Sequence, residues 1–300
     1  MRRLFVFGCS YTAYSWPTYA DMLGGNFDEV QNWGFAGLGN RAIAERLSEC
    51  HIKNNITKDD VVIVQWSSHI RNDFYHMESL PDRLHGWKTC GSIFNYHNVK
   101  LYDRKWVETF FFEPAYIMHT LNFINLAQNF LDGIGCDWYM TSIGSLEQLG
   151  ADMRTKDLYG EKTKFADNLK ESTKTIWDVM PELAIYKKLW NDRPEKWLMP
   201  MELYCQTCPD DTYTFIDIDG SRFQDLHPSV TQHLNYIRQE LKDKLQLTDE
   251  FFDDMQKIAD NIKQKHTKFK TNKIAFEFSV AQCKDPEFEK ITWPTKPQGF

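Results

Sequence analysis

The chain has 300 residues, of which 42% are hydrophobic and 15% aromatic, enough to build a sizeable core in one large or two small domains. Its formal net charge of −7 is unlike that of general nucleic-acid or membrane-surface binders, which carry a concentrated basic face. No apolar stretch approaches the roughly 20 residues that span a bilayer, and the apolar run after Met1 is too short for a signal peptide. We therefore expect a globular, cytoplasmic protein with no nucleic-acid or membrane partner.

The seven cysteines are odd in number and scattered along the chain, which favours reduced thiols over a disulfide framework. Cys205 and Cys208 form the one pair with metal-ligand spacing. A zinc site would need a second pair or a close histidine, and neither is suitably spaced. The sequence therefore predicts no metal site.

The first predicted strand covers residues 4–7 and ends at Gly8, which permits a tight turn that presents Ser10. A helix is expected next, because Trp16, Tyr19 and Leu23 recur at helical spacing. A short strand over residues 29–33 leads into a glycine-rich loop, 34–40, and a second helix follows. The loop matches neither a P-loop nor a dinucleotide fingerprint, so it is expected to connect a strand to a helix.

Residues 61–66 form the strongest predicted strand, apolar and β-branched through their first four positions, as in the centre of a parallel sheet. Polar residues follow at once, among them Ser67, Ser68 and Asn72. The order strand, helix, strand, helix, strand predicts parallel strands joined by right-handed crossovers. These polar residues should therefore lie at the carboxyl edge of the sheet, where open α/β folds bind their ligands.

The second half of the chain alternates irregular stretches with regular elements. Residues 75–112 are predicted to be an insertion over the sheet edge, 113–131 a helix and 136–142 a fourth strand. The irregular stretch 145–208 is rich in aromatic residues, which indicates either a lid or sugar platform or a satellite core under long loops.

A fifth strand is expected over residues 214–218, followed by a helix that begins near Ser229. Thr248 is a suitable cap for another helix, with Asp249 and Glu250 in its first turn. Residues 274–278 are predicted to be a strand. The C-terminal tail is expected to pack on the domain or on a protein partner.

Residues from two distant parts of the chain could combine at the carboxyl edge. A serine in such a turn, taken alone, most often only hydrogen-bonds the backbone of the turn. Acyl transfer at a serine needs a base, a carboxylate that orients the base, and donors for the developing oxyanion. His227 follows the last predicted core strand and so shares this edge with Ser10, and Asp225 lies two residues before it. The sequence therefore predicts a Ser10–His227–Asp225 triad.

The chain resembles the SGNH hydrolases, also called GDSL-type esterases, whose four sequence blocks appear here in the family's order. The first block matches residues 8–12, Gly-Cys-Ser-Tyr-Thr, with Cys9 replacing the usual aspartate. The glycine of the second block matches Gly37. The third block corresponds to residues 65–68, which lack its asparagine, and the last to residues 225–228, Asp-Leu-His-Pro, with one residue fewer between acid and base.

The resemblance implies a three-layer α/β/α, flavodoxin-like sandwich with a five-stranded parallel sheet and large insertions at about 75–112 and 145–208. This domain would span residues 1–247, and residues 248–300 would add a C-terminal helix and an extended tail. The resemblance also implies an oxyanion hole that includes the N–H groups of Ser10 and Gly37. Three side chains could replace the missing asparagine: Asn40, which we favour, Ser67 and Asn72.

The function expected from these residues is hydrolysis of a small O-acyl ester, on a carbohydrate if the family's habit and the aromatic insertions are followed. No organic cofactor is implied. Two alternatives stay open. The chain could be a catalytically weak or inactive binding or structural protein of the same fold, or an O-acyltransferase that uses the same serine.

Overall fold

The computed structural model describes residues 2–75, 87–89, 91–93, 102–147, 175–208, 211–217, 219–281 and 291–292. Four parallel strands form the central sheet: β1 (Arg3–Phe7), β2 (Glu29–Asn32), β3 (Val61–Trp66) and β6 (Asp137–Ser142), in the order β6-β3-β1-β2. A two-residue strand, β9 (Ile291–Thr292), pairs in parallel with β2 at the outer edge. The central strands β1 and β3 are almost wholly buried, as their apolar sequences predict.

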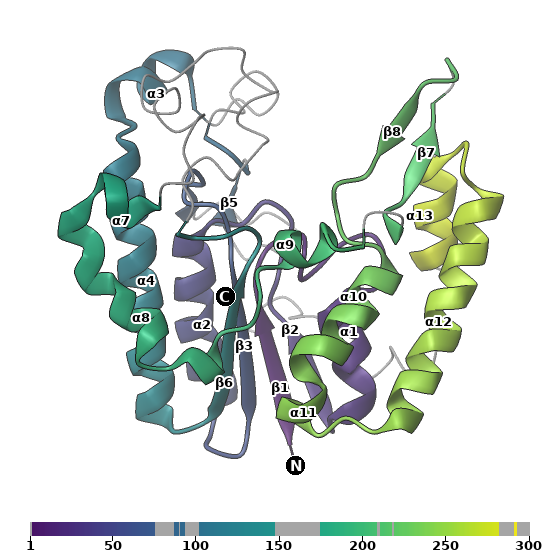
Figure 1. Ribbon diagram of the computed structural model, residues 1–300, viewed down its shortest axis with the longest axis horizontal. Helices are drawn as coiled ribbons and strands as arrows, with labels where there is room; N and C mark the ends of the chain where they lie inside the picture. The colour runs from purple at the N-terminus through teal and green to yellow at the C-terminus, as the bar shows by residue number, and fades with distance from the viewer. Residues whose placement is uncertain are drawn as a thin grey trace.

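Helices cover both faces of the sheet (Figure 1). On one side lie α2 (Asn40–Asn54), α4 (Glu113–Ile134), α7 (Ile176–Val179) and α8 (Lys188–Asn191); on the other lie α1 (Tyr19–Met22), α10 (Val230–Tyr236), α11 (Lys242–Leu245), α12 (Asp249–Lys268) and α13 (Lys273–Ala281). Shorter elements are η1 (Leu23–Asn26), β4 (Phe74–Tyr75), β5 (Trp87–Lys88), α3 (Arg104–Phe110), η2 (Pro181–Lys187), η3 (Pro194–Lys196), α9 (Met201–Cys205) and the π-helical η5 (Ile237–Leu241). The predicted three-layer α/β/α arrangement is therefore confirmed for the described residues.

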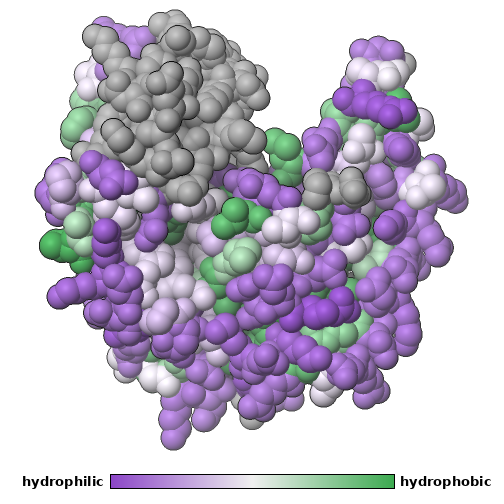
Figure 2. Space-filling model, in the orientation of Figure 1, coloured by the Kyte–Doolittle hydropathy of each residue, from purple (hydrophilic) through white to green (hydrophobic). Residues whose placement is uncertain are grey.

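The prediction of a fifth sheet strand at 214–218 is wrong. Residues Thr214–Ile216 form β7, which pairs antiparallel with β8 (Arg222–Gln224) in a separate hairpin. The short connection contains Gly220 at a φ of +81°, a left-handed conformation that suits a tight reversal. Figure 2 shows this hairpin projecting from the body of the molecule at the upper right.

The prediction of a strand over residues 274–278 is also wrong, because this segment belongs to helix α13. Phe276 is fully buried there, against the rings of Trp16 and Tyr213. The side chain of Asn272 accepts a hydrogen bond from Ala275 N at the start of the helix. Tertiary burial of one helical face thus overrides the strand-like local sequence.

Other predicted elements agree with the structure. The Thr248 hydroxyl accepts a hydrogen bond from Phe251 N and caps α12, and Ser229 caps α10 in the same way. In the second insertion the tryptophans of residues 175–208 pack on the main core, Trp177 within it and Trp190 and Trp197 against it. The rest of that insertion, 148–174, and most of 75–112 lie outside the described residues.

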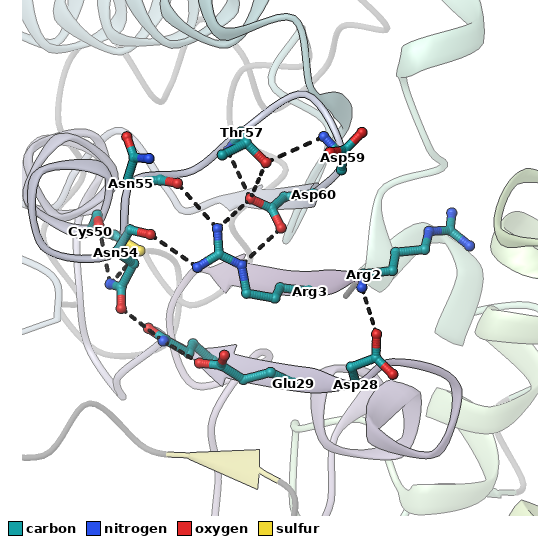
Figure 3. Close-up of polar contacts among 11 residues, drawn as sticks. Arg2, Arg3, Asp28, Glu29, Cys50, Asn54, Asn55, Thr57, Asp59 and Asp60 are labelled. Atoms are coloured by element: carbon teal, nitrogen blue, oxygen red, sulfur yellow. Dashed lines mark hydrogen bonds and ion pairs between the residues drawn. The ribbon is translucent and has the colours of Figure 1, made fainter.

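A cluster of polar contacts fastens the amino ends of the strands (Figure 3). Arg3, the first residue of β1, donates to both carboxylate oxygens of Asp60 at 2.9 and 2.6 Å, and to the carbonyl oxygens of Asn54 and Asn55 at the end of α2. Thr57 donates to Asp60 from its backbone and its hydroxyl. The cluster joins β1, β3 and α2 at the edge opposite the carboxyl ends.

Candidate active site

The serine turn directly follows β1. The N–H groups of Thr12 and Ala13 both donate to Cys9 O, so the chain reverses around Ser10. The Thr12 hydroxyl donates to Gln65 Oε1 at 2.8 Å and occupies the space where a side chain at position 8 would lie, since a Cβ on Gly8 would come within 2.1 Å of it. Gly8 is therefore required by close approach, and the turn is tied to β3.

The structure brings Ser10, His227 and Asp225 together at the carboxyl edge of the sheet. Ser10 Oγ lies 2.9 Å from His227 Nε2, and His227 Nδ1 lies 2.7 Å from Asp225 Oδ1. Asp225 Oδ1 also accepts the His227 backbone N–H at 2.9 Å. This second bond shows how an acid only two residues before the base can reach the ring: the loop folds back so that one carboxylate oxygen serves both groups. A hydroxyl, an imidazole and a carboxylate in this arrangement are chemically able to act as nucleophile, base and orienting acid.

Two tyrosines of the serine turn hold the imidazole. The Tyr14 ring stacks on His227 with centroids 3.7 Å apart, and Tyr11 meets the ring edge-on at 5.5 Å. Tyr11 OH donates to Leu226 O at 2.9 Å. Tyr14 OH donates to Asp225 Oδ2, and burial, with the Asp225 charge beside it, raises the pKa of Tyr14 to about 12, so the hydroxyl stays protonated at neutral pH.

A lysine from the C-terminal helix completes the environment of the acid. Lys273 Nζ lies 2.6 Å from Asp225 Oδ2, the oxygen that does not face His227. Burial alone would raise the pKa of Asp225, but hydrogen bonds from His227 and Lys273 outweigh it and hold this pKa well below its ordinary value. Burial likewise opposes the charge of Lys273, yet Asp225 keeps its pKa above the ordinary lysine value.

Gly37 lies on the glycine-rich loop, close to the serine turn. Phe35 N donates to Gly8 O at 3.2 Å, which ties this loop to the end of β1. Gly37 adopts a φ of +88°, and its carbonyl oxygen accepts the Thr89 hydroxyl. Within the described residues, neither Ser10 N–H nor Gly37 N–H has a hydrogen-bond partner. Both are therefore unengaged donors.

The three side chains considered as substitutes for the missing asparagine differ in their partners. Asn40 binds Ser67, donating to its carbonyl at 2.9 Å and accepting its N–H at 2.7 Å, and donates its other amide hydrogen to Thr120 Oγ1. The Asn72 side chain is engaged with Tyr116. In contrast, the buried Ser67 hydroxyl has no hydrogen-bond partner in the described part of the chain. Our preference for Asn40 is therefore not supported by its contacts.

Ser67 also corresponds in position to Ser10 when β3 and β1 are aligned by their register. Phe7 pairs with Val64 in the register between β1 and β3. Ser10 lies three residues beyond Phe7 and Ser67 three residues beyond Val64, so both follow the ends of adjacent parallel strands.

A pocket of about 310 Å³ lies beyond the end of β6. Its lining includes Ser142, Glu202, Trp190 and Trp197, and the two indole rings are stacked with centroids 5.0 Å apart. Glu202 Oε1 lies 3.1 Å from Tyr11 OH and shares its hydrogen with Leu226 O. One carboxylate therefore joins the pocket to the turn that carries Ser10.

Four residues of this site, Tyr11, Tyr14, Glu202 and Lys273, were not predicted to take part. Tyr11 belongs to the first sequence block, but the block gave it no separate role. Tyr14 could have been recognised as a neighbour of the site, because it lies four residues after Ser10 in the same turn. Lys273 begins helix α13, whereas the sequence predicted a strand over residues 274–278. The contact between Lys273 and Asp225 could therefore not be predicted from the sequence.

The described cysteines, 9, 50, 136, 205 and 208, are free, and Cys9 is buried in the core. The described residues contain no group of three or more histidine, cysteine or acidic side chains placed to hold a metal ion. None of the helices in the described ranges combines the length and apolar character needed to cross a membrane.

The sequence matches no family model and no curated protein. Among solved structures, a catalytic mutant of Axe2, an acetylxylan esterase from Geobacillus stearothermophilus, is similar, with a TM-score of 0.40 and 13% identity over 82% of this chain and 94% of that one. A function for this chain has to be inferred from the residues of its own site.

Proposed function

We propose that the chain is a serine esterase that hydrolyses a small O-acyl ester. The observation that supports this most directly is the continuous hydrogen-bonded line from Ser10 Oγ through the His227 ring to Asp225, at 2.9 and 2.7 Å. A hydroxyl in this arrangement can be deprotonated as it attacks a carbonyl. A lone turn serine would have no reason to sit against an oriented imidazole.

In the proposed reaction Ser10 Oγ bonds to the ester carbonyl carbon while His227 Nε2 takes the hydroxyl proton. The N–H groups of Ser10 and Gly37, with the Ser67 hydroxyl as a third donor, would stabilise the oxyanion. The carbon–oxygen bond to the alcohol breaks as His227 returns the proton to the leaving oxygen. Water then repeats these steps on the acyl-serine and releases the carboxylic acid. Asp225 orients His227 and stabilises the transient imidazolium.

For the alcohol we propose a carbohydrate, bound in the pocket beyond β6. Aromatic rings and carboxylates suit a sugar, since rings pack on its C–H faces and carboxylates accept its hydroxyl hydrogens. The pocket contains both, and about 310 Å³ is within the range of small-ligand sites. The contact between Glu202 and Tyr11, which joins this pocket to the turn that carries Ser10, supports this assignment.

The test is hydrolysis of p-nitrophenyl acetate by the wild type and by Ser10→Ala. We expect Ser10→Ala to lower kcat/KM by about 10³-fold or more, because the triad acts as a unit. Ser15→Ala, an exposed serine in the same loop, is the matched control and should retain full activity. Equal rates for the wild type and Ser10→Ala would remove the esterase proposal and favour a binding protein with this fold.

A further inference from the structure

Lys273 occupies a defined place behind the proposed triad. Its Nζ lies 2.6 Å from Asp225 Oδ2, while the other carboxylate oxygen, Oδ1, lies 2.7 Å from His227 Nδ1. Tyr14 OH donates to the same Oδ2 at 3.2 Å. Both oxygens of the acid are therefore engaged, and the carboxylate cannot rotate without breaking a charged contact.

The helix that carries Lys273 is anchored to the same structure as the triad. Phe276 lies three residues further along α13, on the same helical face, and is fully buried. Its ring contacts Trp16, whose indole N–H donates to Pro228 O at 2.8 Å, directly after His227. Lys273 is thus fixed relative to the acid and the base by the core.

The position of Lys273 is unfavourable for a helix considered alone. It is the first residue of α13, where the helix dipole disfavours a cation by roughly 0.3–1 kcal/mol. Glu277, its other ion-pair partner among the described residues, is 3.5 Å away and lies on the same helix. The closer contact with Asp225 stabilises the charge of Lys273 at this position. The presence of a lysine here therefore follows from its contact with the site and not from the needs of helix α13.

We propose that Lys273 is a positioning residue that clamps the outer oxygen of Asp225, so that the inner oxygen faces His227 and the C-terminal helix α13 becomes part of the acid–base machinery. The inference rests on the proposed esterase function for its catalytic consequence. Its electrostatic consequence can be measured without any substrate.

The charged and titratable groups around His227 determine what removal of Lys273 should do. Asp225 lies beside the ring. Tyr14, whose raised pKa keeps it neutral, stacks on the ring, and Tyr11 meets it edge-on. The buried His233 nearby is uncharged at neutral pH, since burial lowers its pKa to about 3. Within the described ranges, Lys273 is the lysine that forms an ion pair with Asp225 and offsets its charge. Without it, an imidazolium would face an uncompensated carboxylate, so His227 should take up its proton at a higher pH.

The experiment compares Lys273→Met with Lys273→Arg, which keeps the charge. The methionine variant should lose roughly 10–100-fold in kcat with little change in KM, because Lys273 orients the acid and does not touch substrate. The acid limb of its kcat/KM profile should move up by roughly one pH unit. The arginine variant should keep the wild-type limb. Lys257→Met is the matched control, since it removes an equal charge from an exposed ion pair on α12.

A second readout separates this inference from the esterase proposal. The His227 ring signal is titrated by NMR in each variant and assigned by its absence in His227→Asn. An upward shift of the titration midpoint in Lys273→Met, with none in Lys257→Met, supports the clamp even if no ester is hydrolysed. A midpoint and an acid limb that stay at the wild-type pH in a folded Lys273→Met protein overturn it.

Discussion

The two ends of the central sheet use polar residues in opposite ways. At the amino end, the buried Asp60 receives hydrogen bonds from Arg3 and Thr57, and Arg3 extends to two carbonyl groups of the α2 terminus. At the carboxyl end, Ser67 Oγ and the N–H groups of Ser10 and Gly37 have no partner within the described residues. Buried polar groups are normally paired, so the unpaired donors are where a ligand is expected.

The largest effect is expected where an unpaired group is removed. Ser67→Ala should lower kcat for ester hydrolysis by roughly 10²-fold, the typical effect of losing one oxyanion donor. The Tm should stay the same or rise slightly, because the hydroxyl makes no hydrogen bond to any described residue. Esterase assays and thermal melts with Ser68→Ala as control would measure both. Unchanged kcat in Ser67→Ala would exclude the hydroxyl as a donor.

A second prediction concerns Asp73, which is fully buried beside the start of α2 and accepts the Gly39 N–H at 2.9 Å. Burial raises its pKa to about 6, although hydrogen bonds from Thr89, Gly39 and Ala42 oppose this. The folded state therefore binds the proton more tightly than the unfolded state, and this group's contribution to stability is lost as pH rises from about 4 to 6.

Asp73→Asn keeps an acceptor for Gly39 and removes the titration. Its free energy of unfolding, relative to the wild type, should increase by roughly 2–2.5 kcal/mol between pH 4 and pH 7. Urea unfolding of both proteins at a series of pH values measures this difference. A difference that does not change with pH would show that Asp73 is ionised as easily in the folded chain as in the unfolded one.

The smallest effect is expected at the amino end. Arg3→Met should lower the free energy of unfolding by about 2 kcal/mol at neutral pH, because it leaves a buried carboxylate with fewer partners, and should leave kcat unchanged. Although burial opposes its ionisation, Arg3 and Thr57 hold the pKa of Asp60 below its ordinary value, so the loss should diminish as the solution is acidified below pH 4. Reduced kcat in folded Arg3→Met protein would mean that the two ends are coupled.

The sequence was most informative where an apolar run was followed by polar residues that a parallel sheet would place at its carboxyl edge. Ser10, Asp225 and His227 could be found because each follows an apolar run, and the carboxyl ends of such runs meet at one edge. The same logic placed Asp225 and His227 after a sheet strand, which is wrong in detail: they follow β8 of the hairpin. Two short runs so close together pair with each other more readily than with a distant sheet.

Lys273 and Ser67 mark the limit of prediction from the sequence. Residues 274–278 are apolar except for Glu277, and only the burial of Phe276 against distant aromatic rings selects a helix. Asn40 was preferred to Ser67 because an amide is the usual donor, but whether a donor is free depends on partners such as Thr120, far along the chain. Such contacts are properties of the fold.

The reactivity of Ser10 toward a fluorophosphonate probe at neutral pH tests the proposed function most directly. We expect covalent labelling of the wild type at Ser10, mapped by mass spectrometry, with no labelling of Ser10→Ala and strongly reduced labelling of His227→Ala. Labelling that is absent from the folded wild type, or that persists in Ser10→Ala, would contradict the claim that this site activates its serine.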